Sequence, residues 1–216
     1  MLSVGPDPVL VERMLAGGEL RCPDCGGVLA RWGHTAERFV RVLAGGVKRV
    51  RLRRSICPKT TRVDGCGRSH VLLPRVLLGR RLDEVGVIWS VLVARAGGWG
   101  WRRAAGLAGR PASTVRGWLA RFADRAQIIR QGFAELEELV SAADGGDMDR
   151  LVPAGGPLSD AVAQIGACLA ALRRSRGEAV FTVSPAQVVA VLSGGWLLGR
   201  RALRATGLWS NTSPHL

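Results

Sequence analysis

The sequence lacks the residue patterns that nucleotide-hydrolysing and DNA-cleaving enzymes require. Its glycine-rich stretch Gly97–Gly100 is not followed by the Lys-Ser or Lys-Thr pair that holds phosphates and Mg²⁺ in a P-loop. A DDE transposase needs three metal-binding carboxylates on an RNase-H-like mixed sheet, whereas the segment after residue 125 is too short and mostly helical. Its acidic residues lie in a linker and on helix surfaces: Asp144, Asp147, Asp149, Asp160 and Glu178. We therefore expect no enzymatic activity, no catalytic residues and no catalytic cofactor.

Signals for export or membrane insertion are also lacking. Residues 1–20 contain neither the basic region nor the long apolar region of a signal peptide. Residues 179–199 are uncharged and just long enough for one span, but Ser184 and Pro185 begin a helix that Gly194 and Gly195 end. We therefore expect a cytoplasmic protein that does not enter a membrane. In a reducing compartment, clustered cysteines bind metal more often than they form disulfides.

Lysine is nearly absent, and the basic charge is unevenly distributed. Lys48 and Lys59 are the only lysines, so the formal net charge of +14 comes almost entirely from arginine, a bias that a GC-rich genome also produces. Residues 1–125 hold 23 Lys and Arg against 9 Asp and Glu, whereas residues 126–216 hold 8 of each. This asymmetry predicts a polyanion-binding part joined to a neutral part. The alternative is a basic surface that is simply solvated.

The hydrophobic patterns predict an α+β fold that is mostly α-helical. Residues 1–78 are expected to form a short helix, within residues 7–18, and a small β domain. Alternation over Val47–Ile56 predicts one strand there, and the preceding Phe39–Leu43 completes a hairpin with it. A three-helix domain follows over residues 79–125, with helices at Val85–Ala96, Trp101–Ala108 and Ala112–Asp124. The rest is expected to be a connecting helix (126–143), a linker rich in Asp, Gly and Pro (144–157) and a C-terminal helical region of unknown role (158–216).

Four cysteines are spaced as metal ligands. Cys22 and Cys25 form a C-x2-C turn followed by two glycines, which let backbone amides turn toward the thiolates. Cys57 and Cys66 form a second pair, and the predicted hairpin separates it from the first pair. Two cysteine pairs separated by a hairpin match the plan of a zinc ribbon with a closed, structural Zn²⁺ site. The eight residues between the second pair then represent a loop insertion. His70 follows Cys66 at a ligand spacing and is an alternative ligand.

Other interpretations of these residues are less favoured. A catalytic zinc would need an open coordination position beside an acid or base, and a redox C-x2-C would need a βαβ context; neither pattern is present. His34 is expected to be structural. Cys168 lies on the apolar stripe of a helix and is expected in the core.

Residues 85–122 fit a helix-turn-helix. The motif needs a small residue where two helices cross, a turn glycine four residues later and an apolar residue six further on. Ala105, Gly109 and Val115 occupy these positions. The preceding helix is expected to bury one face: Val85, Ile88, Trp89, Leu92 and Val93. The alternative is an ordinary three-helix bundle with a charged face.

If this motif binds double-stranded DNA, its last helix reads the major groove. Arg116 is the expected base contact, because bidentate Arg–guanine pairing is the commonest specific interaction. Ser113 or Thr114 would cap that helix or bind a phosphate. Arg110, in the turn, would reach the DNA backbone. The remaining expected contacts come from both helices and from the hairpin: Arg102, Arg103, Arg121, Arg49, Arg51, Arg53 and Arg54.

Four stretches, Gly18–Gly27, Trp32–His34, Cys66–Pro74 and Gly109–Leu119, resemble actinobacterial mobile-element proteins with a zinc ribbon and a helix-turn-helix. These are domains of unknown function encoded beside transposase or integrase genes, and a similar arrangement forms the DNA-end-binding front of several bacterial transposases. The resemblance covers residues 9–122, and more loosely reaches residue 133. It implies a role in DNA binding in, or derived from, transposition. The C-x8-C spacing departs from the short second knuckle of that family.

The sequence thus predicts a non-enzymatic, sequence-specific DNA-binding protein with a structural zinc ribbon, accessory to or derived from a transposase. Its expected partners are double-stranded DNA, a second copy in a homodimer, and a transposase or integrase. One alternative is a transcriptional regulator. Another is a zinc-ribbon adaptor that binds proteins and does not read DNA sequence.

Overall fold

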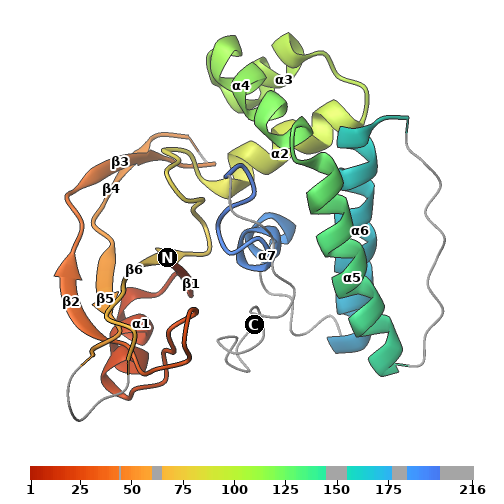
Figure 1. Ribbon diagram of the computed structural model, residues 1–216. Helices are drawn as coiled ribbons and strands as arrows, with labels where there is room; N and C mark the ends of the chain where they lie inside the picture. Colours follow the sequence, from red (N-terminus) through yellow and green to blue (C-terminus); the bar gives the residue numbers. More distant parts are fainter. Residues whose placement is uncertain (44, 60–64, 145–154, 177–183, 200–216) are drawn as a thin grey trace.

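The computed structural model describes residues 1–43, 45–59, 65–144, 155–176 and 184–199, and its fold is α+β. A strand-rich N-terminal region lies beside a helical region, and α7 (Pro185–Leu192) lies between them (Figure 1). The predicted fold class is therefore confirmed at this level.

The strand-rich region contains a mixed sheet and a separate hairpin. The sheet has the order β1-β6-β5-β2, in which β1 (Leu2–Val4) runs parallel to β6 (Ser69–Pro74), while β5 (Arg53–Ile56) and β2 (Ala30–His34) continue it antiparallel. The hairpin pairs β3 (Arg38–Arg41) with β4 (Val47–Val50). Helix α1 (Pro8–Ala16) starts at Asp7, whose side chain accepts a hydrogen bond of 2.8 Å from the Val9 N–H. The short helix predicted within residues 7–18 is therefore present.

The single strand predicted over Val47–Ile56 is two strands in the structure. β4 pairs only with β3, whereas β5 pairs with β2 and β6. Between them Leu52 is buried with Val40, Leu73 and Leu77 in a small core. Its backbone is held by Thr35, whose N–H donates to the Leu52 carbonyl at 2.8 Å and whose Oγ1 accepts from the Leu52 N–H at 3.1 Å. The predicted strand is therefore interrupted at Leu52, which lies in this core.

The helical region comprises α2 (Val85–Ala96), α3 (Trp101–Ala108), α4 (Ala112–Ala123), α5 (Ala126–Asp144), α6 (Pro157–Arg176) and α7. The bounds of the first three lie within one residue of those predicted. The buried residues of all these helices form one hydrophobic cluster, which includes Cys168 as expected. The segment 79–125 therefore shares its core with α5, α6 and α7.

The buried face of α2 differs in part from the prediction. Val93 is 45% exposed, whereas Val87 and Val91 are buried, and Trp89 is only partly buried. The reason is that α2 contacts α3 and α4 and also contacts α6 and α7, so more than one stripe is covered. In the described ranges no helix has both the length and the apolar character needed to cross a membrane.

Candidate metal centre and arginine-rich helical surface

The structure brings the four predicted cysteine ligands together. Their Sγ atoms all lie within 4.8 Å of one another. Cys22 Sγ is 3.6 Å from Cys66 Sγ, and Cys25 Sγ is 3.5 Å from Cys57 Sγ. Four sulfurs bound tetrahedrally at about 2.3 Å from one ion would lie about 3.8 Å apart. The cluster therefore has the size and the donors to hold a metal ion.

The two cysteine turns share one backbone pattern although their lengths differ. In the first, the Cys22 carbonyl accepts from the Gly26 N–H at 2.8 Å and the Cys22 N–H donates to the Gly27 carbonyl at 2.7 Å. In the second, Cys57 makes the same pair of bonds with Gly67 and Arg68, at 2.9 and 2.8 Å. Gly26 and Gly67 also share a left-handed backbone, with φ of 75° and 73°. The extra residues of C-x8-C therefore lengthen only the loop between the ligands.

Burial and backbone donors act differently on these thiols. Burial raises the pKa of the Cys22 thiol to about 12 and also raises the pKa of the Cys57 thiol. The backbone N–H of Gly27, followed by the Cys57 thiol, lowers the pKa of Cys25 to about 7. A cation at the centre of the cluster would stabilise all four thiolates, since metal coordination deprotonates a thiol.

His70 lies at the edge of the cluster. Its ring is buried, with Nε2 at 3.3 Å from Cys22 Sγ and Nδ1 at 3.2 Å from the Met1 nitrogen. It forms a second group of ligand atoms with Cys22 and Asp24. Because that group shares Cys22 with the four-cysteine set, His70 is either an exchangeable ligand or a hydrogen-bond partner of the Cys22 sulfur. His34, in contrast, is exposed and lies 3.3 Å from Arg53.

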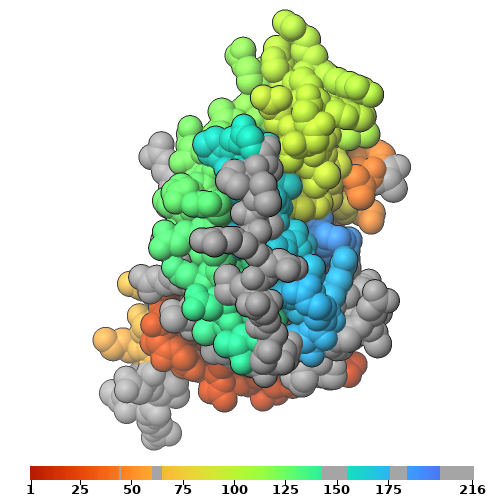
Figure 2. Space-filling view, turned by 90° about the vertical axis from the view of Figure 1, so that its right-hand side faces the viewer, coloured from red at the N-terminus to blue at the C-terminus, as the bar shows by residue number. Residues whose placement is uncertain are grey.

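The three residues that define the predicted turn between α3 and α4 have the required environments. Gly109 is left-handed (φ 59°, ψ 38°), and the Arg110 N–H donates to the Ala105 carbonyl at 3.1 Å. Ala105 and Val115 are buried, as is Trp118 one turn later. Figure 2 shows α3 and α4, in yellow-green, projecting from one end of the molecule, opposite the red N-terminal segment. The exposed faces of these helices are therefore accessible.

Tryptophan rings organise the arginines on this surface. Arg102 and Arg116 lie over the ring of Trp101 at 4.4 and 5.9 Å from its centroid, and Arg103 lies 3.8 Å from the Trp99 centroid. Trp101 thus connects an arginine of α3 with one of α4. No role was predicted for Trp99 or Trp101 from the sequence. Their position beside two consecutive arginines was the available signal.

Arg110 has a different environment from the one predicted. Its Nε donates to Asp83 Oδ1 at 2.5 Å, and the two side chains are only 14% and 7% exposed. The Arg110 guanidinium therefore ties the turn to the segment before α2.

The side-chain cap predicted at the start of α4 is absent. Pro111 is the N-cap and no side chain caps the helix, so neither Ser113 nor Thr114 is the cap. Ser113 is exposed and Thr114 half-buried in the first turn. Arg121 lies near the other end of α4, where it donates to the Gly117 carbonyl at 3.0 Å and lines a separate pocket.

The arginines of the strands are dispersed. Arg49 pairs with Glu37 at 3.6 Å and Arg53 pairs with Glu12 at 2.8 Å, while Arg51 is exposed and Arg54 half-buried. β5, which carries Arg53, lies well away from α3 and α4 (Figure 1). The structure therefore does not gather Arg53 with the helical arginines.

No family model matches the chain, and no curated protein and no solved structure is significantly similar to it.

Proposed function

We propose that this protein binds double-stranded DNA through α3 and α4, with a structural Zn²⁺ at the four cysteines stabilising the strand-rich region. The observation that carries the proposal is the layer of exposed arginines stacked on Trp99 and Trp101, on two helices joined by a left-handed glycine turn. Such a layer presents positive charge in a fixed orientation at a projecting end of the molecule. No catalytic role is proposed.

Zinc is the metal that suits this donor set best. Four thiolates in a tetrahedron bind zinc or an iron–sulfur centre, and a compact cluster with two buried sulfurs suits a closed structural site. The ligands would be Cys22, Cys25, Cys57 and Cys66, with His70 as the alternative. Metal analysis of the purified protein should give about one zinc per chain and no iron.

Within the proposed surface, α4 would read base edges and α3 would bind the backbone. Ser113 and Arg116 are exposed on the first turns of α4, the part of a recognition helix that enters the major groove. Arg102 and Arg103 at the start of α3 would bind phosphates. Because one such module gives modest specificity, a second copy bound to an adjacent half-site would be needed for a long recognition sequence.

The test is a selection of genomic DNA fragments with zinc-loaded full-length protein at near-physiological salt. Enrichment of one discrete motif is expected. A motif at the ends of a mobile element would support a role beside a transposase or integrase, whereas a promoter motif would support transcriptional regulation. Binding without enrichment that weakens steeply with salt would reduce the interaction to phosphate contacts and contradict sequence-specific reading.

The β3–β4 hairpin favours a second candidate, a protein-interaction adaptor. Three of its apolar side chains are exposed: Phe39 by 62%, Leu43 by 60% and Val47 by 59%. Solvent-exposed apolar groups on one hairpin are typical of a protein-contact surface. Replacing Phe39 and Val47 by Ser should abolish binding to a transposase or polymerase partner and leave DNA binding unchanged. Loss of DNA binding alone would contradict the adaptor.

A further inference from the structure

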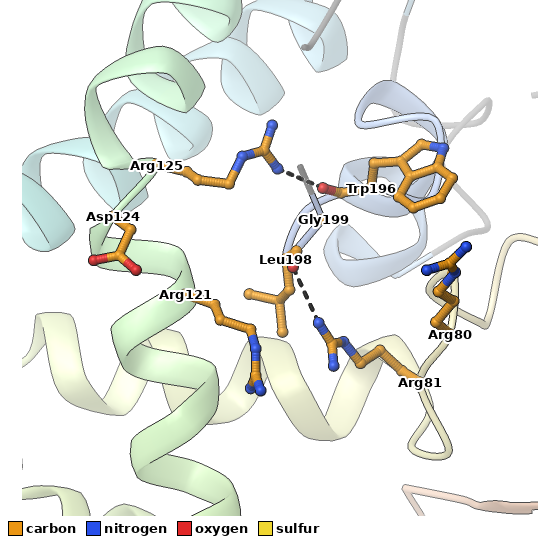
Figure 3. Close-up of a pocket in the computed structure, with 9 residues that line it drawn as sticks. Arg80, Arg81, Arg121, Asp124, Arg125, Trp196, Leu198 and Gly199 are labelled. Atoms are coloured by element: carbon orange, nitrogen blue, oxygen red, sulfur yellow. Dashed lines mark hydrogen bonds between the residues drawn. The ribbon is translucent and has the colours of Figure 1, made fainter. Parts of the chain in front are cut away.

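A second basic feature is a pocket where three distant segments of the chain meet. Its volume is about 600 Å³, which lies in the range of small-molecule sites. Its lining comes from the loop before α2, the end of α4 with the following turn, and the segment after α7: Gly79, Arg80, Arg81, Arg121, Asp124, Arg125, Trp196, Leu198 and Gly199 (Figure 3).

The pocket has a large excess of positive charge. Four of its lining residues are arginines and one, Asp124, is acidic. Within the described part of the chain, Arg80, Arg81 and Arg121 form no ion pair. An anionic ligand would balance the charge of these three arginines.

Two of the arginines are held in place by backbone carbonyls. Arg81 donates to the Leu198 carbonyl at 3.0 Å, and Arg125 donates to the Trp196 carbonyl at 2.6 Å (Figure 3). A guanidinium has five N–H donors, so the bond to Leu198 orients Arg81 without using all of its donors. Arg81 Nε is buried and has no hydrogen-bond partner in the structure.

The neighbouring arginines affect one another. Burial lowers the pKa of Arg81, and the positive charge of Arg121 lowers it further. Figure 3 shows the guanidinium groups of these two residues approaching each other below Leu198. Arg80 is the only non-glycine residue with positive φ (59°) in the described ranges, a strained backbone that occurs preferentially at functional loops. An anion between the guanidinium groups of Arg81 and Arg121 would relieve their repulsion.

We propose that this pocket binds the phosphate groups of a ligand. Planar guanidinium forks pair with two oxygens of a phosphate at once, which a single lysine cannot do. The phosphate can come from a free di- or triphosphate compound or from the backbone of bound DNA. The proposal does not depend on DNA reading by α3 and α4, because the proposed reading residues lie outside the pocket.

The test is calorimetric titration of the zinc-loaded full chain with inorganic pyrophosphate, with ATP, and separately with duplex DNA, at near-physiological salt. The pocket variants are Arg81→Gln and the double variant Arg80→Gln with Arg121→Gln. Because Arg80 and Arg121 are exposed, the double variant should keep the fold, which thermal melting checks. Arg130→Gln, an exposed arginine on α5, is the matched control for loss of charge.

The wild type should bind pyrophosphate, and each pocket variant should bind it about tenfold more weakly or worse, while Arg130→Gln changes affinity less than about twofold. If the pocket variants bound duplex DNA more weakly but bound pyrophosphate and ATP as the wild type does, the DNA backbone would be identified as the source of the phosphate. Unchanged affinity for every probe in both variants would overturn the proposal, and so would an equal loss in Arg130→Gln. Arg116→Ala, which should affect DNA but not pyrophosphate, separates failure of the pocket from failure of the proposed DNA reader.

Discussion

At the scale of single residues, Trp101 explains why an arginine of α3 and an arginine of α4 can act together. Arg102 and Arg116 lie over its ring at 4.4 and 5.9 Å from the centroid, so a single side chain orients guanidinium groups from both helices. An arginine that stacks on an indole keeps its charge and has fewer rotamers to lose when it binds DNA. In the proposed function, the ring would hold both arginines ready for an anionic partner.

Arg116 and Arg102 should differ in their effect on DNA binding. We expect Arg116→Ala to weaken the selected site by about 1–3 kcal/mol and non-specific DNA much less, because a base contact is lost. Arg102→Ala should weaken all sequences about equally and reduce the salt dependence by about one phosphate contact. Competition titrations with selected and scrambled duplexes measure both effects. Equal, sequence-independent losses in the two variants would remove α4 as the reading helix.

The cysteine cluster gives a second prediction at this scale. Cys22→Ser should lose the bound metal and destabilise the strand-rich region by several kcal/mol, because Cys22 is buried and its sulfur lies against Cys66 and His70. The control is Cys168→Ala, since Cys168 is also buried but lies in the helical core. Metal content and hydrogen exchange of residues 1–78 measure the outcome. A Cys22→Ser protein that retains its metal and its protection would refute the assignment.

The sequence predicted that the four cysteines come together, whereas it did not reveal the ion pairs of several arginines. A C-x2-C turn with glycines occurs in few kinds of site, so it identified the first pair of candidate ligands. Cys57 and Cys66 were then the natural second pair. Arginine serves many purposes, and its role depends on partners distant in sequence. Arg110 pairs with Asp83 and Arg53 with Glu12, and neither pairing has a local signal.

At the scale of elements, the Cys57–Cys66 turn repeats the backbone pattern of the Cys22–Cys25 turn with a longer loop between its cysteines. Pro58 and Gly65, which flank the loop, lie so close that a Cβ on Gly65 would overlap the Pro58 carbonyl and lie 3.0 Å from Cys57 Sγ. The chain can therefore be joined across this gap without moving the cysteines. We expect deletion of residues 59–64, which creates a second C-x2-C, to leave the metal stoichiometry unchanged. The free energy of unfolding should fall by no more than about 1 kcal/mol.

Metal analysis and thermal melting of the deletion variant measure this outcome. Gly65→Ala in the full-length chain is the informative contrast, because the added Cβ has no room and should weaken metal binding. Loss of metal after the deletion would mean that the loop itself supports the site.

The turn between α3 and α4 can be tested with two glycines of one segment. Gly109 is left-handed, with φ of 59°, whereas Gly106 lies inside α3, and a Cβ at either position would meet no atom within 4 Å. Backbone conformation alone should therefore decide whether alanine raises or lowers the free energy of unfolding at each position. Gly109→Ala should destabilise the protein by about 1–2 kcal/mol and Gly106→Ala should stabilise it by about 0.5–1 kcal/mol. Denaturant unfolding measures both, and stabilisation by Gly109→Ala would contradict the turn geometry.

Helix ends were predictable because glycine and proline mark them locally, as at Gly97, Gly109 and Pro111. The bounds of the strands were not predictable in this way. The alternation over Val47–Ile56 is compatible with one strand, and the interruption at Leu52 depends on a core that includes Leu73 and Leu77. Likewise, Val93 fits an apolar stripe of α2, but the neighbours of α2 come from α6 and α7 as well as α3 and α4.

At the scale of the whole molecule, the helices that would bind DNA share their core with the C-terminal helices. Ile165 of α6 and Val189 of α7 are fully buried in the same cluster as Ile88 of α2 and Phe122 of α4. The structure thus contains a strand-rich unit with its own small cores and one larger helical unit. The domain boundary predicted at residue 125 misses this shared core, because an apolar stripe shows that a helix face is buried but not which helix covers it.

The last prediction follows from that shared core. A fragment of residues 75–125 should not fold alone, because removing α5, α6 and α7 exposes apolar side chains of α2 that are now buried, and its remaining core is too small. A fragment of residues 75–199 should give helical circular dichroism and a cooperative thermal transition without metal, since the cysteine cluster lies outside it. Cooperative melting of the shorter fragment would show that the three helices are an independent domain, and the C-terminal helices would then lose their structural role in presenting the arginine surface.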